Sequence, residues 1–154
     1  MKKIFSLIAI FAIVFVQQGF AQDSSKSATL NSYYNLKDAL VKSNSNAASA
    51  SATELVKNIA GLETGAAVEE NRAALIKDAT AISASKDIKV QRQRFALLSA
   101  NMIVLAKTVK FTADPVYQQY CPMQNASWLS NSKTIKNPFY GNAMLSCGSV
   151  KATL

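Results

Sequence analysis

The sequence predicts an all-α fold, an up-down four-helix bundle followed by an irregular C-terminal cap. Apolar residues in the first part of the chain recur at every third or fourth position, as on the buried face of a helix. All three prolines lie at or after position 115, so no proline interrupts a helix before that point. Beyond it, Pro, Asn, Ser and aromatic residues replace the Ala-rich pattern. We therefore expect one domain, with the bundle over residues 28–113 and the cap over residues 114–154.

Four segments carry the helical pattern. They cover residues 28–43, 47–62, 66–85 and 88–111. The last is the most regular, because five apolar residues alternate by three and four positions: Phe95, Leu98, Met102, Leu105 and Val109. Short polar connections join the segments, and this favours antiparallel neighbours in space.

The cap is expected to contain a short β-hairpin. The best strand candidates are Ser127-Trp128-Leu129 and Leu145-Ser146-Cys147. Residues 130–133, which are Ser, Asn, Ser and Lys, are the predicted turn.

The N-terminus has the pattern of a secretory signal peptide over residues 1–21. Lys2 and Lys3 precede an apolar run too short for a comfortable membrane span, and the small-residue site Gly19-Phe20-Ala21 follows. Residue 22 is Gln, whereas a lipid anchor needs Cys there. We expect a flexible leader over residues 22–27, no stable membrane insertion after cleavage, and a periplasmic or secreted protein. Loss of two lysines lowers the net charge from +8 to +6.

The chain contains no histidine. This excludes Ser-His-Asp and Cys-His nucleophile systems and the usual catalytic zinc sites. Gly61 and Gly65 lack the Lys-Ser/Thr of a phosphate-binding loop and follow a predicted helix, and the carboxylates are scattered over separate segments. The basic residues form no long run, and an exported protein does not meet DNA. We expect neither an enzyme nor a nucleic-acid partner.

Both cysteines lie in the last quarter of the chain, and each has a methionine close by. Cys121 and Met123 share one face of an extended segment, and Met144 and Cys147 meet across one turn. Convergence of the two pairs creates a site with two thiolates and two thioethers. Such ligands select soft ions, above all Cu(I). Two aromatic residues, Tyr120 and Trp128, are candidates for shielding the site from water, and the alternative role of each is as the aromatic anchor of the cap.

A disulfide between Cys121 and Cys147 is the alternative, because disulfides form and persist in the oxidising compartments that exported proteins enter. Closing this loop of about 27 residues stabilises a chain by about 3 to 4 kcal/mol in the entropic model. Oxidised cysteines cannot serve as thiolate ligands, so the two interpretations exclude each other. The sequence leaves both open.

Several motifs resemble a bacterial exported domain-of-unknown-function family that is associated with copper/silver-efflux membrane-fusion proteins. The most specific lie in the cap: residues 116–123, which end in Cys-Pro-Met, 128–130 (Trp-Leu-Ser), 135–141, which end in Asn-Pro-Phe-Tyr-Gly, and 144–148 (Met-Leu-Ser-Cys-Gly). Further similarity lies in residues 34–41 and 93–99. The connection between Cys-Pro-Met and Trp-Leu-Ser, residues 124–127, is shorter than the family pattern.

The resemblance implies a helical exported module associated with heavy-metal resistance. It implies four candidate metal residues: Cys121, Met123, Met144 and Cys147. The resulting hypothesis is a Cu(I)- or Ag(I)-binding accessory module of an envelope metal-efflux system, with a membrane-fusion or other efflux protein as its partner. The alternative is a structural or protein-interaction module that has the disulfide and no metal.

Overall fold

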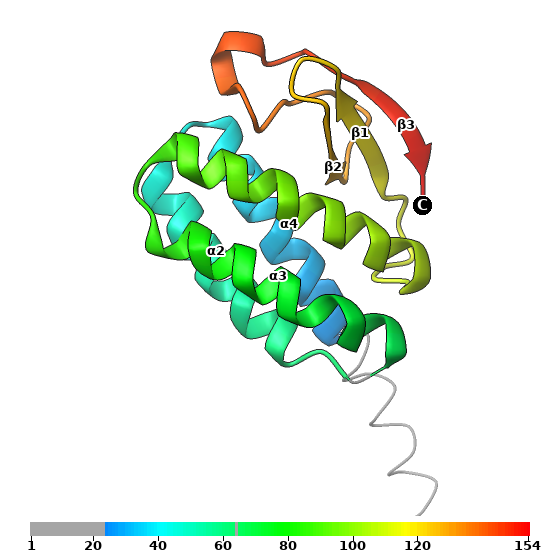
Figure 1. The fold of residues 1–154 in the computed structure, drawn as a ribbon. Helices are drawn as coiled ribbons and strands as arrows, with labels where there is room; N and C mark the ends of the chain where they lie inside the picture. The colour runs from blue at the N-terminus through cyan, green and yellow to red at the C-terminus, as the bar shows by residue number, and fades with distance from the viewer. Residues whose placement is uncertain (1–23, 64) are drawn as a thin grey trace, which may run out of the picture.

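The computed structural model describes residues 24–63 and 65–154, and within them a bundle of four helices precedes a small sheet (Figure 1). The helices are the N-terminal helix, described over residues 24–41, α2 (Ser45–Ala60), α3 (Ala66–Ala84) and α4 (Ile88–Thr108). The cap contains β1 (Tyr117–Cys121), β2 (Ala126–Ser130), the short 3-10 helix η1 (Gly141–Met144) and β3 (Ser149–Thr153). The predicted bundle with a C-terminal cap is confirmed. The predicted signal peptide lies outside the described residues.

Polar side chains fix the helix ends at the predicted connections. Asn44 Oδ1 accepts a hydrogen bond from the N–H of Ala47 at the start of α2, and Asp87 Oδ1 accepts one from Lys89 at the start of α4. At the end of α2, the Arg72 guanidinium of α3 donates to main-chain carbonyls, including that of Leu62 at 2.8 Å. These contacts satisfy groups that a helix terminus leaves unpaired.

The chain is already helical at residue 24, whereas we expected a flexible leader up to residue 27. Three side-chain contacts account for the difference. Ser25 Oγ donates to the carbonyl of Gly61, Ser27 Oγ donates to that of Phe111, and Thr29 Oγ1 donates to that of Ser25. Polar composition suggested solvent exposure, but the Ser25 and Ser27 hydroxyls attach the helix to the end of the bundle, and the Thr29 hydroxyl bonds within the helix itself.

The sheet has the strand order β2-β1-β3, and β1 is antiparallel to both neighbours. β2 contains the predicted strand 127–129, but the prediction for 145–147 is wrong. Residues 145 and 146 form a turn after η1, because the Cys147 N–H bonds back to the carbonyl of Met144. The hairpin turn is also elsewhere, at residues 122–125 between β1 and β2, where Asn125 has a φ of 51°. Asparagine tolerates this left-handed conformation better than most residues.

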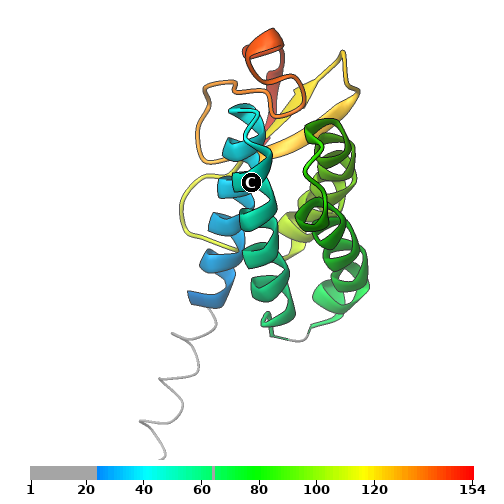
Figure 2. The ribbon, with the colours of Figure 1, turned by 90° about the vertical axis from the view of Figure 1, so that its left-hand side faces the viewer.

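The sheet lies against the N-terminal helix and α4 (Figures 1 and 2). A chain of aromatic contacts continues from the bundle into the cap: Tyr33 stacks on Phe95, Phe95 meets Phe139, and Phe139 meets Trp128 with ring centroids 5.8 Å apart. At the centre, the hydroxyl of Tyr33 lies 2.6 Å from Ser99 Oγ and accepts the N–H of Leu129. Bundle and cap thus share one hydrophobic core.

Two adjacent tyrosines provide a test of this junction. Tyr33→Phe is expected to lower the free energy of unfolding by about 1 to 3 kcal/mol, because it leaves the Leu129 N–H buried and unpaired. Tyr34→Phe is the matched control, since the Tyr34 hydroxyl is buried with no partner in the described part of the chain. Its loss is expected to change stability by less than about 0.5 kcal/mol. Urea unfolding of both variants measures the difference, and equal losses would contradict the assignment.

Candidate functional site

The structure brings the two cysteines together. Cys121 is the last residue of β1, and Cys147 precedes β3 by two residues. Pairing of β1 with β3 places their sulfurs 3.4 Å apart, with both thiols free. A disulfide bond needs about 2.0 Å. Two thiolates on one tetrahedral metal with bonds of about 2.3 Å lie about 3.8 Å apart. The observed pair is thus close to the spacing of a shared ion and within a small adjustment of a disulfide.

Hydrogen-bond donors from the hairpin turn and from two later segments of the cap surround the sulfur of Cys121. Burial of this thiol opposes ionisation, but four donors favour the thiolate: the N–H of Gln124, the thiol of Cys147, the amide of Asn137 and the N–H of Met123. Together they outweigh burial and lower the pKa of Cys121 below that of an ordinary thiol. The lowered pKa favours the thiolate, which is the form of cysteine that ligates metals.

Cys147 behaves in the opposite way. Its hydrogen bond to Cys121, followed by burial and the charge of that neighbour, raises the pKa of Cys147. The two thiols therefore titrate as a pair. The pair loses its first proton more readily than an isolated thiol, and its second less readily.

This splitting predicts a maximum in the stability of the reduced protein as pH changes. The lowered pKa of Cys121 adds stability that is lost as pH falls through the pKa of Cys121 in the folded protein. The raised pKa of Cys147 adds stability that is lost as pH rises through the pKa of Cys147 in the folded protein. The maximum is expected near the pKa of an unfolded thiol, about 8.5. Unfolding measured from pH 6 to pH 10 on the reduced protein, minus that of the Cys121→Ser, Cys147→Ser double variant, tests it. A difference that only rises or only falls is the contrary result.

Asn137 is a site residue that the sequence analysis did not single out individually. Its side chain is fully buried, donates to the carbonyl of Cys147 at 2.9 Å and accepts the N–H of Phe139 at 2.8 Å. The same amide contributes to the low pKa of Cys121. Asn137 thus connects both cysteine segments. The signal in the sequence was its place in an Asn-Pro pair, which favours a turn.

Gly148 allows the second cysteine segment to approach β1. Its φ is +147°, and a Cβ at this position would lie 2.9 Å from the carbonyl of Tyr120 and 3.0 Å from the ring of Trp128. A larger residue would therefore push Cys147 away from Cys121. Trp128 is fully buried in the core next to this segment. Tyr120 is half-buried, and its hydroxyl donates to Asn125 in the hairpin turn.

The methionines are placed differently from the cysteines. β1 ends at Cys121, so Met123 lies in the hairpin turn and not on one extended face with Cys121 as predicted. Met123 is 64% exposed and Met144, the last residue of η1, is 39% exposed. Cys121, in contrast, is completely buried. The structure thus joins the two thiols directly and leaves both thioethers in contact with solvent, on turns adjacent to them.

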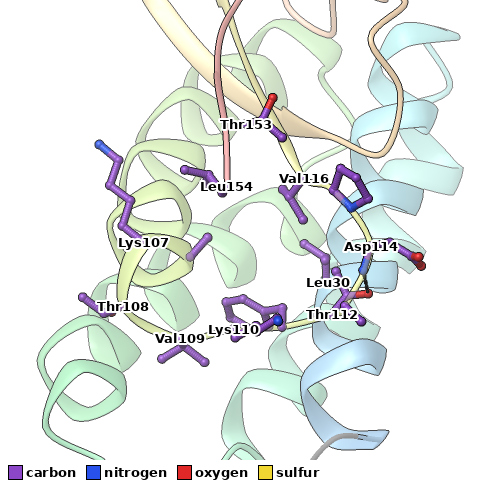
Figure 3. A pocket seen from close by; sticks show the side chains of 14 residues that line it. Leu30, Lys107, Thr108, Val109, Lys110, Thr112, Asp114, Val116, Thr153 and Leu154 are labelled. Carbon is purple, nitrogen blue, oxygen red and sulfur yellow. Dashed lines mark hydrogen bonds between the residues drawn. The ribbon is translucent and has the colours of Figure 1, made fainter.

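A pocket of about 490 Å³ lies at the opposite end of β1 from the cysteines (Figure 3). The loop after α4 and the end of the described chain line it, together with Leu30 of the N-terminal helix. Residues such as Val116 and Leu154 give it a mainly apolar lining, and Asp114 and Lys107 lie around it. It contains none of the predicted site residues. The cysteines and methionines of the candidate site therefore do not line this pocket.

Within residues 24–63 and 65–154, no three cysteines or carboxylates gather into a metal-binding group. The thiol pair is therefore not joined by a third Cys, Asp or Glu ligand in this part of the chain. None of the helices in this part of the chain is long and apolar enough to cross a membrane.

Comparison with known proteins identifies a family. The family model described as "Protein of unknown function (DUF3347)" matches residues 29–114, more than half of the chain. The match covers the bundle and stops before β1, so the thiol pair lies outside it. No curated protein and no solved structure matches the chain. The chain belongs to the DUF3347 family of proteins of unknown function.

Proposed function

We propose that the protein binds a soft monovalent metal ion, Cu(I) or Ag(I), at the thiol pair of Cys121 and Cys147. The observation that carries the proposal is the 3.4 Å separation of the two sulfurs together with the lowered pKa of Cys121. A preformed pair of sulfur ligands with one thiol readily ionised suits ions that prefer thiolates. The absence of histidine removes the usual imidazole ligand of Zn(II) and Cu(II).

Met123 and Met144 act as outer ligands in this proposal. Their exposure allows an incoming ion to meet a thioether before it reaches the buried sulfur of Cys121. Thioethers bind soft ions but carry no charge, so the two cysteines hold the ion and the methionines assist its entry and release.

The biological setting that we propose is the cell envelope, where the signal peptide would deliver the protein. The resemblance of the cap motifs to an exported family of unknown function that is associated with copper/silver-efflux membrane-fusion proteins supports a role as an accessory module that transfers the ion to an efflux protein. The net positive charge of the protein does not oppose the binding of a cation, because the cysteine ligands are anionic thiolates when they bind.

A structural disulfide is the second candidate, and the same proximity of the sulfurs favours it. Forming it requires that the two thiols lose two protons and two electrons to a disulfide or quinone oxidant of the compartment. The bond would join the end of β1 to the segment before β3. Intact-mass analysis with and without reductant distinguishes the states, since the disulfide form is two mass units lighter.

Titration of the fully reduced protein with Cu(I) against a competing chromophoric chelator tests the metal proposal. We expect one tightly held ion per chain. The Cys121→Ser, Cys147→Ser double variant is expected to compete no better than a protein without a site. Met102→Leu is the matched control, because Met102 is a completely buried core methionine, and it should retain the affinity of the unchanged protein. Equal Cu(I) affinities of the double variant and the unchanged protein would contradict the proposal.

A further inference from the structure

The solvent-facing side of α4 carries a second apolar stripe, opposite the one that faces the core. Seven positions from just before the helix to its last turn are exposed, with spacings that alternate between four and three: Lys86, Val90, Gln93, Leu97, Ala100, Val104 and Lys107. We call this set the α4 seam. Its large apolar members, Val90, Leu97 and Val104, are 39%, 52% and 53% exposed. They recur every seven residues.

The heptad spacing of the seam is the pattern of a helix that packs against another helix. The core side of α4 is already filled, since Phe95, Leu98 and Met102 are completely buried. The seam is therefore additional to what the fold requires. Val90 and Val104 are separated by about 21 Å at the helical rise of 1.5 Å per residue. This length accommodates about four turns of a partner helix with knobs-into-holes contacts.

Four lysines dominate the charge around the seam, although Asp87, which is also exposed, caps the start of α4. The sequence has no Asp or Glu between Asp87 and Asp114. Lys86 and Lys89 lie at one end of α4 and Lys107 and Lys110 at the other, and all four are exposed. Arg94, beside the seam, is engaged with Asp78 of α3 at 3.6 Å. An apolar stripe between two pairs of lysines is complementary to an acidic amphipathic helix.

We propose that the α4 seam docks an amphipathic helix of a partner protein, one with apolar residues at heptad spacing and acidic residues at its flanks. A second copy of this chain fits less well. Packed parallel or antiparallel, two α4 helices would bring lysine ends against lysine ends, and such like-charge contacts are unfavourable. The seam also leads to the pocket of about 490 Å³, since Lys107 and Thr108 belong to its lining (Figure 3). That hollow can receive an apolar side chain from the end of the partner helix.

A synthetic peptide provides the probe. We would label a 28-residue helix with Leu at its a and d positions and Glu at its e and g positions, and measure its fluorescence anisotropy at nanomolar concentration with the whole protein. We expect saturable one-to-one binding that weakens with salt. Leu97→Glu and Val104→Glu are each expected to weaken it at least tenfold. A peptide with Lys in place of Glu should not bind.

Val150→Glu is the matched control, because Val150 is as exposed as Val90 but lies on β3, and it should leave binding unchanged. Circular dichroism confirms that each variant is folded. Three results would overturn the proposal: no binding of the acidic peptide, equal binding by the seam variants, or binding of the Lys peptide as well. Binding to phosphatidylglycerol vesicles without peptide binding would instead assign the seam to a membrane surface. A dimer in sedimentation that Leu97→Glu dissociates, without peptide binding, would assign it to a second copy.

Discussion

Replacing Cys121 with serine is expected to weaken Cu(I) binding by the reduced protein at least about 100-fold, or about 2.8 kcal/mol. Cys121 is the thiol whose pKa is lowered by donors from the hairpin turn, Asn137 and Cys147, and its sulfur is completely buried at the centre of the proposed site. A serine hydroxyl is a harder ligand and stays protonated at neutral pH. The N–H groups of Met123 and Gln124 would then face a neutral oxygen. Competition titration of the reduced variant measures the loss.

The methionines are expected to contribute much less. Met123→Leu and Met144→Leu each remove an exposed, uncharged thioether, so each should weaken binding less than about tenfold. Their main effect is expected on the rate at which the ion enters or leaves. Should Met123→Leu cost as much affinity as Cys121→Ser, the division into holding and outer ligands would be incorrect.

Gly141→Ala is expected to lower the free energy of unfolding by about 2 to 4 kcal/mol. Gly141 begins η1 with a φ of +55°, a left-handed conformation that alanine adopts only with strain. A Cβ there would lie 2.7 Å from the guanidinium of Arg92, 2.8 Å from Ser43 Oγ and 2.9 Å from the carbonyl of Val41. The Val41 carbonyl is main chain and has little freedom to move away.

The contact that Gly141 permits connects three parts of the fold. Arg92 of α4 donates to the carbonyl of Pro138 in the cap and to that of Leu40 in the N-terminal helix, each at 2.9 Å. Gly61→Ala is the control, because Gly61 has an ordinary φ of −86° and its added Cβ would meet no atom closer than 3.6 Å. It should be neutral or stabilising by up to about 1 kcal/mol. Urea unfolding of both variants is the measurement, and similar losses would contradict this account of Gly141.

The bundle was predictable because its helices obey a local rule. The apolar period of residues 88–111 indicated α4, and the observed helix ends three residues before that range does. The same apolar period predicted the other helices. Polar residues such as Ser25 gave no sign that the N-terminal helix includes residues 24–27. Hydrogen bonds from these serines to distant carbonyls are tertiary contacts that a periodic pattern cannot reveal.

The sheet was less predictable because none of its strands combines alternating apolar and polar residues with one buried face. In β1, the inward side chain of Gln119 is polar. It is completely buried, and its amide N–H groups donate to the carbonyls of Ser132 and Thr134. β3 does alternate, as Ser-Val-Lys-Ala-Thr, but it is mostly exposed on both sides. Neither strand therefore combines the period-two pattern with the buried apolar face that marks a half-buried strand.

The members of the candidate site were predicted, but not their arrangement. Cys121 and Cys147 attracted attention as soft ligands, yet their approach depends on the pairing of β1 with β3. The contribution of main-chain N–H groups to the pKa of Cys121 depends on the conformation of the turn at residues 122–125. Composition contains no direct signal for either. Asn137 and Gly148 lie within the motifs of the cap, but their contacts with the two cysteine segments are visible only in three dimensions.

The most direct measurement of the central claim is X-ray absorption at the copper edge of the reduced protein loaded with one Cu(I) per chain. We expect a first coordination shell of sulfur alone, with the shell lost in the Cys121→Ser, Cys147→Ser double variant. A shell of nitrogen or oxygen, or an unchanged sulfur shell in the double variant, would show that this thiol pair is not the metal site.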